Sequence, residues 1–271
     1  MPKALTPEQQ RHYRTAGHTF PIRVLSAAEA DLYRGECDRL ETLLGGRPRT
    51  VEVRQMHLHL PWAYRLAAHP RVLDAVQDLL GPNLLIWATE LFAKHPHDSV
   101  VSIAWHRDGA YMGLDAERTV TAWIALTESG PTNGGMRVAQ EPNRLEYLQS
   151  AGDRKAPSGK QLVSPAEDKI VEVALQAGEM SLHDVHVLHG SGVNQSGDKR
   201  VGFAVRFTTP ETKPAIDRPP ALLVRGEDRW GHFELFDPPS EDDPERALGG
   251  LRASARQHLE ATLQNLKQAA R

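Results

Sequence analysis

The feature that most constrains the fold is a series of short runs, rich in β-branched and aromatic residues, that begins at Leu84. Turn-forming residues bound the runs and no helical pattern separates them, so each run predicts a β-strand. Many short strands joined by turns are typical of a sandwich or jelly roll. The strands are expected at 84–94, 119–127, 169–174, 179–182 and 200–208.

Helices are expected at the two ends of the chain. Capping boxes at Thr6–Gln9 and Ser26–Glu29 begin two helices near the N-terminus. The second helix stops at Gly45-Gly46, and Pro70 to Leu80 forms a third. The charged tail from Asp242 carries leucines at roughly helical spacing, which predicts a helix packed on the body or, alternatively, a contact between subunits.

We expect a single domain over residues 1–271, made of a helical part (1–83), a jelly-roll core (84–210) and a C-terminal extension (211–271). Within the core, residues 141–167 form a long polar stretch rich in Gly, Pro and Ser. A loop of this length in a compact domain is usually functional. We therefore expect it to be a mobile lid that excludes water from a site.

Charge and cysteine content exclude several classes of protein. The net charge is −3 and no basic cluster stands out, so we expect no nucleic-acid or membrane-surface partner. The polar start, Met1 to Thr15, and the lack of a long apolar run predict no signal peptide and no membrane span. Cys37 is the only cysteine, which excludes an internal disulfide and favours a cytoplasmic location.

The clearest chemical motif is His106-Arg107-Asp108. On an extended backbone His106 and Asp108 point to the same side, so both can bind one ion. His189 is the candidate for a third ligand. Two histidines and one carboxylate on one face of an octahedron form the facial triad of non-haem iron(II) oxygenases. A bare His-x-Asp pattern is common by chance, so a surface pair is the alternative interpretation of His106 and Asp108.

A second motif is the predicted strand that starts at Arg200. Its alternation places Arg200, Gly202, Ala204 and Arg206 on one face and apolar residues on the other. An arginine among small residues forms a slot whose guanidinium suits bidentate binding of a carboxylate. The far carboxylate of 2-oxoglutarate is the expected guest, and a surface ion pair is the alternative.

In order and spacing, these motifs resemble the phytanoyl-CoA dioxygenase family, especially its bacterial members that modify small metabolites. The resemblance covers roughly residues 5–210 and implies a double-stranded β-helix, a cupin-like jelly roll that holds iron between its sheets. The matching stretches are Leu80–Asn83, Trp87–Lys94, Trp105–Asp108, Val120–Leu126, Asn133–Gly135 and Gly178–Arg206.

The resemblance also implies roles for individual residues. It makes His106, Asp108 and His189 the catalytic iron(II) ligands, and Arg200 the anchor for 2-oxoglutarate. Three further residues fall where the family lines the co-substrate pocket, although a surface lysine, a core tryptophan and a turn serine are the alternative interpretations. These residues are Lys94, Trp123 and Ser191.

The reaction that the resemblance implies is hydroxylation of a small organic molecule by O2, with release of succinate and carbon dioxide. Desaturation, epoxidation or cyclisation with the same cofactors are alternatives, as is a non-catalytic jelly roll that binds a metal or ligand. Arg200 argues against the non-catalytic protein and against a metalloenzyme that does not use 2-oxoglutarate. Halogenating relatives lack the carboxylate ligand, so Asp108 argues against halogenation. We expect a monomer or homodimer.

The substrate contacts are the least defined part of the site. His57 and His59 alternate in a short stretch that we expect to be extended, and Arg206 shares a strand face with Arg200. These three side chains are candidates to contact the substrate, with two half-exposed histidines as the alternative.

Two departures from the family pattern affect the substrate side. Arg107 stands between the ligands where relatives commonly have Gln, and Ala139–Asn143 replaces the Pro-Gly-Ser-His run that usually follows the paired glycines.

Overall fold

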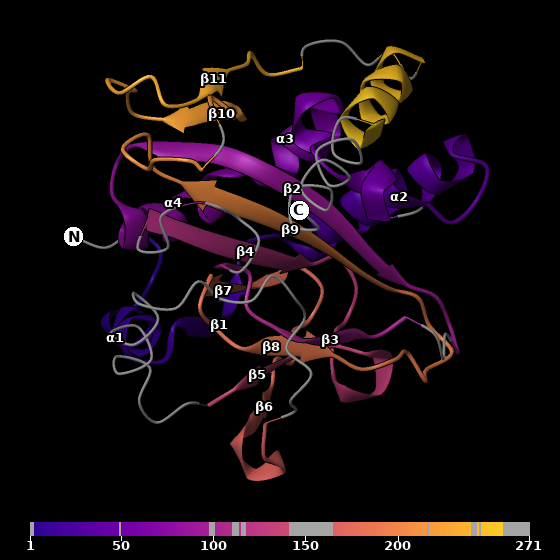
Figure 1. Ribbon diagram of the computed structural model, residues 1–271. Helices are drawn as coiled ribbons and strands as arrows, with labels where there is room; N and C mark the ends of the chain where they lie inside the picture. The colour runs from indigo at the N-terminus through magenta and orange to yellow at the C-terminus, as the bar shows by residue number, and fades with distance from the viewer. Residues whose placement is uncertain are drawn as a thin grey trace, which may run out of the picture.

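The computed structural model describes residues 3–48, 50–97, 101–109, 114, 118–140, 165–215, 217–239, 243 and 245–256. Within these residues the fold is mainly β, as predicted. Two sheets are formed, one in the order β1-β7-β4-β9-β2-β10-β11 and the other in the order β3-β8-β5-β6 (Figure 1).

The large sheet has seven strands. They are β1 (His18–Arg23), β2 (Leu84–Lys94), β4 (Thr119–Ala125), β7 (Glu179–Asp184), β9 (Arg200–Thr208), β10 (Pro220–Arg225) and β11 (Glu234–Leu235). The small sheet has four short strands. They are β3 (Ile103–His106), β5 (Met136–Ala139), β6 (Ile170–Glu172) and β8 (His189–Ser191).

The helices lie mostly before the first long strand. They are α1 (Pro7–Ala16), α2 (Ala27–Leu43), α3 (Pro61–Ala67) and α4 (Pro70–Leu80), with 3-10 turns η1 (Thr50–Val53), η2 (Met56–Leu58), η4 (Pro131–Asn133) and η5 (Glu167–Lys169). Both predicted capping boxes are formed, at Thr6 and at Ser26. Helix α4 has the predicted bounds and ends at Gly81. Helix α3 was not predicted.

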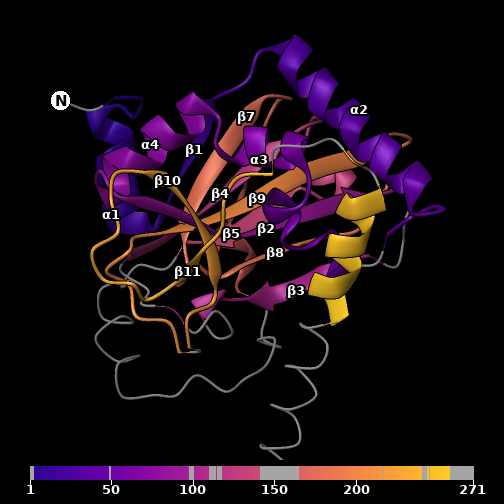
Figure 2. The same ribbon diagram turned by 90° about the horizontal axis from the view of Figure 1, so that it is seen from above.

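The two faces of the large sheet differ, and β9 shows the difference most clearly. Val201, Phe203 and Val205 are buried in the main hydrophobic core together with side chains of α2, α3 and α4. Figure 2 shows these helices on that side of the sheet. The alternate residue Ala204 packs instead with Trp123 and with side chains of β5 in the small sheet. The predicted alternation is therefore confirmed, and the inner face of β9 is turned toward the small sheet.

The large sheet extends beyond the range 84–210 predicted for the jelly-roll core. Strand β1 lies in the part expected to be helical and pairs antiparallel with β7. Strand β10 lies in the C-terminal extension and pairs antiparallel with β2. The run His18–Arg23 contains Pro21, which masks the strand pattern and is tolerated because β1 is at the edge of the sheet.

Two predictions lie largely outside the described residues. The expected lid, 141–167, is described only from residue 165, so it stays a prediction. In the C-terminal tail, residues 245–256 are helical, with Ala247 and Leu251 buried against the main core. The remaining leucines of that stripe are not among the described residues.

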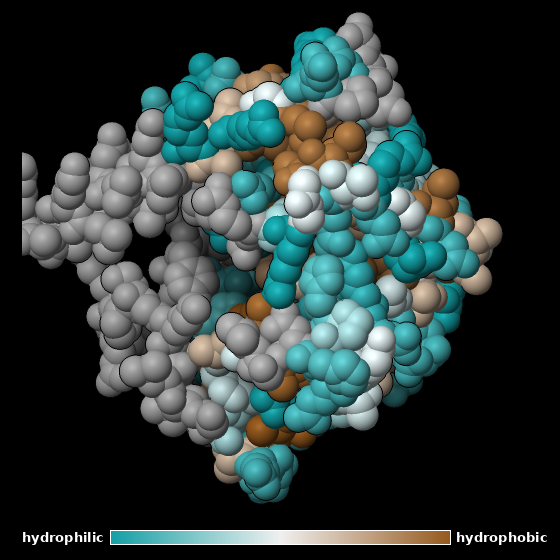
Figure 3. All heavy atoms as spheres, turned by 90° about the vertical axis from the view of Figure 1, so that its right-hand side faces the viewer, coloured by the Kyte–Doolittle hydropathy of each residue, from teal (hydrophilic) through white to brown (hydrophobic). Residues whose placement is uncertain are grey.

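Most of the residues coloured by hydropathy in Figure 3 are polar; the largest group of apolar residues lies in the upper half, and smaller groups lie elsewhere on this face. None of the helices that the structure describes has the length and apolar character needed to cross a bilayer.

Candidate metal centre

The structure brings His106, Asp108 and His189 together on the small sheet. His106 ends β3 and is paired with His189 on β8, while Asp108 follows two residues after β3. One nitrogen or oxygen of each side chain lies within 4.8 Å of the others. Oδ1 of Asp108 is 3.6 Å from Nε2 of His106 and 4.0 Å from Nε2 of His189. Three donor atoms therefore converge on one point, as a metal site requires.

Hydrogen bonds fix the tautomer of both imidazoles. Nδ1 of His106 lies 2.8 Å from the carbonyl oxygen of Ala104, and Nδ1 of His189 lies 2.9 Å from that of Val187. A carbonyl can only accept, so each Nδ1 carries the proton and each Nε2 presents a lone pair. Such backing by a backbone carbonyl orients metal-binding histidines.

Electrostatics keep the same groups in their ligating protonation states. Burial lowers the pKa of His189 to about 4, so this imidazole is neutral at neutral pH. Burial alone would raise the pKa of Asp108, but its neighbour His106 and the positive charge of Arg206 outweigh burial and hold that pKa well below its ordinary value. A neutral imidazole and an ionised carboxylate are the forms that bind metal.

Arg200 and Lys94 lie side by side on the inner face of the large sheet, where they are cross-strand partners on β9 and β2. Each is only 2% exposed. Arg200 Nη2 donates to the carbonyl oxygen of Gly134 at 2.9 Å, and its guanidinium carbon lies 5.4 Å from the centre of the Trp123 ring. The interpretations as surface residues are therefore wrong for both Lys94 and Arg200.

Ser191 connects this cation pair to the metal cluster. Its Oγ accepts a hydrogen bond from Lys94 Nζ at 2.7 Å, and it follows His189 by two residues on β8. Residues two apart on a strand share a face. Ser191 and His189 therefore point to the same side of the small sheet, and the polar site spans the gap between the two sheets.

His57 and His59 are not on an extended stretch, so that prediction is wrong: the chain forms the 3-10 turn η2 there. His57 is fully buried, with Nδ1 3.0 Å from Oγ1 of Thr89. Thr89 is paired with Val205, whose side chain faces the helices, so His57 lies on the side of the large sheet away from Asp108. His59 Nε2 is 2.8 Å from Oγ of Ser254.

Arg206, the third expected substrate contact, points toward Asp108. Its Nη1 donates to Glu90 at 3.1 Å, and its Nε lies 3.9 Å from Oδ2 of Asp108. Arg107, the residue that departs from the family pattern, donates to the carbonyl oxygen of His186, in the turn between β7 and β8.

Sequence reasoning missed two polar residues around the cluster and placed a third, His183, near His189 without making it a ligand. Thr121 donates to Oδ2 of Asp108 at 3.5 Å, and Glu90 pairs with Arg206. The ring of His183 lies 4.9 Å from that of His189, and its buried Nδ1 has no hydrogen-bond partner among the described residues. No local motif marks Thr121 or Glu90, because their contacts form only when segments distant in sequence come together in the fold.

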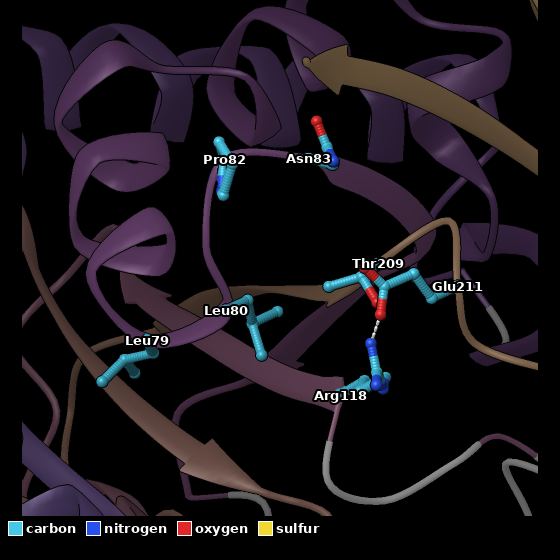
Figure 4. A pocket seen from close by; sticks show the side chains of 7 residues that line it. All are labelled: Leu79, Leu80, Pro82, Asn83, Arg118, Thr209 and Glu211. Carbon is cyan, nitrogen blue, oxygen red and sulfur yellow. Dashed lines mark ion pairs between the residues drawn. The ribbon is translucent and has the colours of Figure 1, made fainter. Parts of the chain in front are cut away.

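A separate pocket of about 110 Å³ lies where α4 leads into β2 (Figure 4), with an ion pair between Arg118 and Glu211 at its edge. None of the predicted site residues lines it. Its lining residues are Leu79, Leu80, Pro82, Asn83, Arg118, Thr209 and Glu211.

Comparison with known proteins agrees with this geometry. The profile of the phytanoyl-CoA dioxygenase family matches residues 13–202. The chain is 25% identical over 240 residues to an ectoine dioxygenase of Streptomyces avermitilis, covering 78% of this chain and 81% of the relative. It is 22% identical over 234 residues to a probable alpha-ketoglutarate-dependent hypophosphite dioxygenase of Stutzerimonas stutzeri, covering 77% and 80%.

Solved structures share the fold. A non-heme monooxygenase, ThoJ, superposes with a TM-score of 0.80 at 34% identity, covering 95% of this chain and 99% of that one. CytC3 with Fe(II) and alpha-ketoglutarate shares the fold at a TM-score of 0.63 and 20% identity, covering 86% and 93%. Because the family profile spans well over half of the chain, this protein belongs to the phytanoyl-CoA dioxygenase family of iron- and 2-oxoglutarate-dependent enzymes.

Proposed function

We propose that this protein uses Fe(II), 2-oxoglutarate and O2 to hydroxylate a C–H bond of a small organic molecule, releasing succinate and carbon dioxide. His106, Asp108 and His189 are the proposed metal ligands. The donor set fits the ion, because two imidazoles and one carboxylate suit Fe(II) and leave three coordination positions open. When bound, the iron supplies the oxygen chemistry, for which the protein provides ligands, orientation and exclusion of water.

The observation that carries the proposal is the environment of Arg200. Its side chain is buried, no carboxylate of the described residues forms an ion pair with it, and its Nε makes no hydrogen bond. Burial lowers the pKa of Arg200 to about 10, so it is still protonated at neutral pH. A buried charge without a counter-ion is costly. The far carboxylate of 2-oxoglutarate would supply the counter-ion and accept from the planar guanidinium.

The neighbouring residues support the same ligand. Lys94 adds a second positive charge beside Arg200, and Trp123 covers the guanidinium with an apolar ring. In such a setting a carboxylate is attracted and water is excluded, which strengthens the ion pair. A protein that only bound a metal would gain nothing from this buried cation pair.

Asp108 favours hydroxylation over halogenation. With its carboxylate bound to the ion, no ligand position is left for a halide at that point. We therefore expect no chlorinated product even at high chloride concentration. Desaturation, epoxidation and cyclisation use the same cofactors and are alternative outcomes. The cytoplasmic location and the monomeric or dimeric state stay predictions.

The test is an anaerobic titration of the protein with Fe(II) and 2-oxoglutarate. The keto-acid chelate should produce its weak visible charge-transfer band, and admission of O2 should yield succinate. A His189→Ala variant is the control, because it lacks one ligand and should give neither. If the unmodified protein shows no band and forms no succinate at saturating iron and 2-oxoglutarate, the proposal is wrong.

A further inference from the structure

The two carboxylate oxygens of Asp108 lie in different surroundings. Oδ1 faces the two imidazole nitrogens of the cluster. Oδ2 faces away from them, 3.9 Å from Nε of Arg206 and 3.5 Å from Oγ1 of Thr121. One oxygen is therefore directed to the metal position, and the other is directed to the large sheet.

Arg206 is itself fixed on its other side. Its Nη1 is 3.1 Å from Oε2 of Glu90, while Oε1 of Glu90 is 3.2 Å from Nε of Arg54. The side chains of Glu90 and Arg206 are 4% and 16% exposed. Arg54, Glu90, Arg206 and Asp108 thus form a row of alternating charges that is neutral in sum. A buried row of this kind holds its members in one geometry, because moving one member leaves its neighbour unpaired.

We propose that Arg206, fixed by Glu90, is a positioning residue that restrains Asp108 to bind the metal through Oδ1 alone. This inference rests on the proposed function, because it takes Asp108 as a metal ligand. A carboxylate that binds through one oxygen leaves three of six positions open for the keto acid and O2. If both oxygens of Asp108 bound the ion, one of those positions would be lost.

The same geometry argues against Arg206 as a substrate contact or as the co-substrate anchor. Its donors face Glu90 and Asp108. Burial alone would lower the pKa of Arg206, but the charges of these two carboxylates outweigh burial and raise that pKa. Arg200, at the other end of β9, has no such partners among the described residues. The two arginines of one strand face therefore have different roles.

The experiment uses Mn(II) alone as the probe, with the full-length protein and three variants. Binding is measured from the electron paramagnetic resonance signal of free Mn(II), and the bound waters are counted by water-proton relaxation. Arg206→Met removes the charged donor but keeps an unbranched stem of similar shape. Arg54→Met is the matched control, because Arg54 contacts the same Glu90 without reaching Asp108. Arg206→Lys keeps the charge but not the planar fork.

For Arg206→Met we expect the dissociation constant of Mn(II) to rise about 10-fold or more, the range seen when an outer partner of a ligand is removed. We also expect one fewer bound water, because the released carboxylate can bind through both oxygens. Arg54→Met should stay within about threefold of the wild type and keep its waters, and Arg206→Lys should resemble Arg206→Met. Thermal unfolding shows which variants are folded. If Arg206→Met is not folded, the Mn(II) affinity and bound waters of Arg206→Lys test the inference.

The opposite result is equally clear. If the Arg206 variants bind Mn(II) as well as the wild type or more tightly, and keep the same waters, the guanidinium only repels the ion and the inference is overturned. If the wild type itself does not bind Mn(II), the proposed function fails, and the ligand role of Asp108 fails with it.

Discussion

At the scale of the residue, the site is governed by charges that the protein buries at a cost. Arg200 and Lys94 are two cations on adjacent strands, and each is removed from water. Like charges held so close together destabilise the protein unless an anion joins them. The folded protein should therefore favour an anionic ligand at this position.

Replacing Arg200 by Ala should therefore weaken 2-oxoglutarate much more than the metal. Truncation of one partner of a buried charge pair costs roughly 2–5 kcal/mol, so we expect at least about a 30-fold rise in the dissociation constant for 2-oxoglutarate. Arg225→Ala, on β10, is the control, because Arg225 pairs with Asp74 instead. A change of less than about threefold for Arg200→Ala would mean that another group anchors the co-substrate.

His57 should make stability depend on pH. Burial lowers its pKa from 6.5 to about 3, so the folded protein keeps the imidazole neutral while the unfolded chain protonates it. Stability is then lost as the pH falls from 6.5 toward 3, by about 2 kcal/mol between pH 7 and pH 5. Denaturant unfolding of the metal-free protein should show this loss, and the slope should be smaller by that amount in His57→Gln, because the lowered pKa of His189 contributes equally to both proteins. Equal slopes for the two proteins would exclude His57 as its source.

How much of the site could be predicted from sequence depends on how its residues come together. His106 and Asp108 are two residues apart in sequence, so alternation along an extended backbone predicts that they lie on one side, although β3 itself ends at His106. Arg200 was found from the pattern of its own strand. Thr121 and Glu90 could not be found this way. Thr121 reaches Asp108 from the facing sheet, and Glu90 reaches Arg206 through the pairing of β2 with β9. Register is a property of the assembled sheet.

At the scale of the element, the long strands and the short strand β6 were predicted, whereas the short strands β3, β5 and β8 were not. The bounds of β2 and β9 agree with the predicted runs, since eleven and nine residues give the alternation room to repeat. Strands β3 and β8 have four and three residues, too few for any pattern. These two strands nevertheless carry the two histidines of the proposed metal site.

Gly202 provides an element-scale prediction. A Cβ built at this position of β9 would lie 2.0 Å from Cζ2 of Trp123, and pairing of β9 with β4 prevents the strands from separating. Gly202→Ala should displace the indole, lower stability by about 1–3 kcal/mol and weaken 2-oxoglutarate, because Arg200 stacks on that ring. Denaturant unfolding and a binding titration measure both effects.

Gly192→Ala is the control for that variant, because a Cβ there meets nothing within 4 Å. The interpretation of Gly202 as the space for Trp123 fails if the two alanine variants behave alike.

At the scale of the whole molecule, the residues of the proposed site come from both sheets. The metal ligands belong to β3 and the small sheet, whereas Arg200 and Lys94 belong to the large sheet. A metal with bound 2-oxoglutarate would therefore touch both layers. Ligand that binds only the folded state stabilises it by about 2.7 kcal/mol at 100 times its dissociation constant.

We accordingly expect Mn(II) together with 2-oxoglutarate to raise the thermal midpoint by roughly 5–10 °C, measured by calorimetry at such saturation. In Arg200→Ala the increment from the metal should remain while the increment from 2-oxoglutarate is lost. If 2-oxoglutarate gives the same increment in Arg200→Ala as in the wild type, the large sheet has no part in holding it.

Because the proposed site spans two sheets, the distance between the sheets should select the length of the keto acid that binds. Facing sheets are held about 10 Å apart by the side chains that fill the space between them. A keto acid chelated by the metal on one layer must place its second carboxylate at the guanidinium on the other layer. A dicarboxylic keto acid one carbon shorter than 2-oxoglutarate would not reach the guanidinium. A keto acid one carbon longer would have to adopt a bent conformation. We therefore expect the packing between the two sheets to select the keto acid by its length.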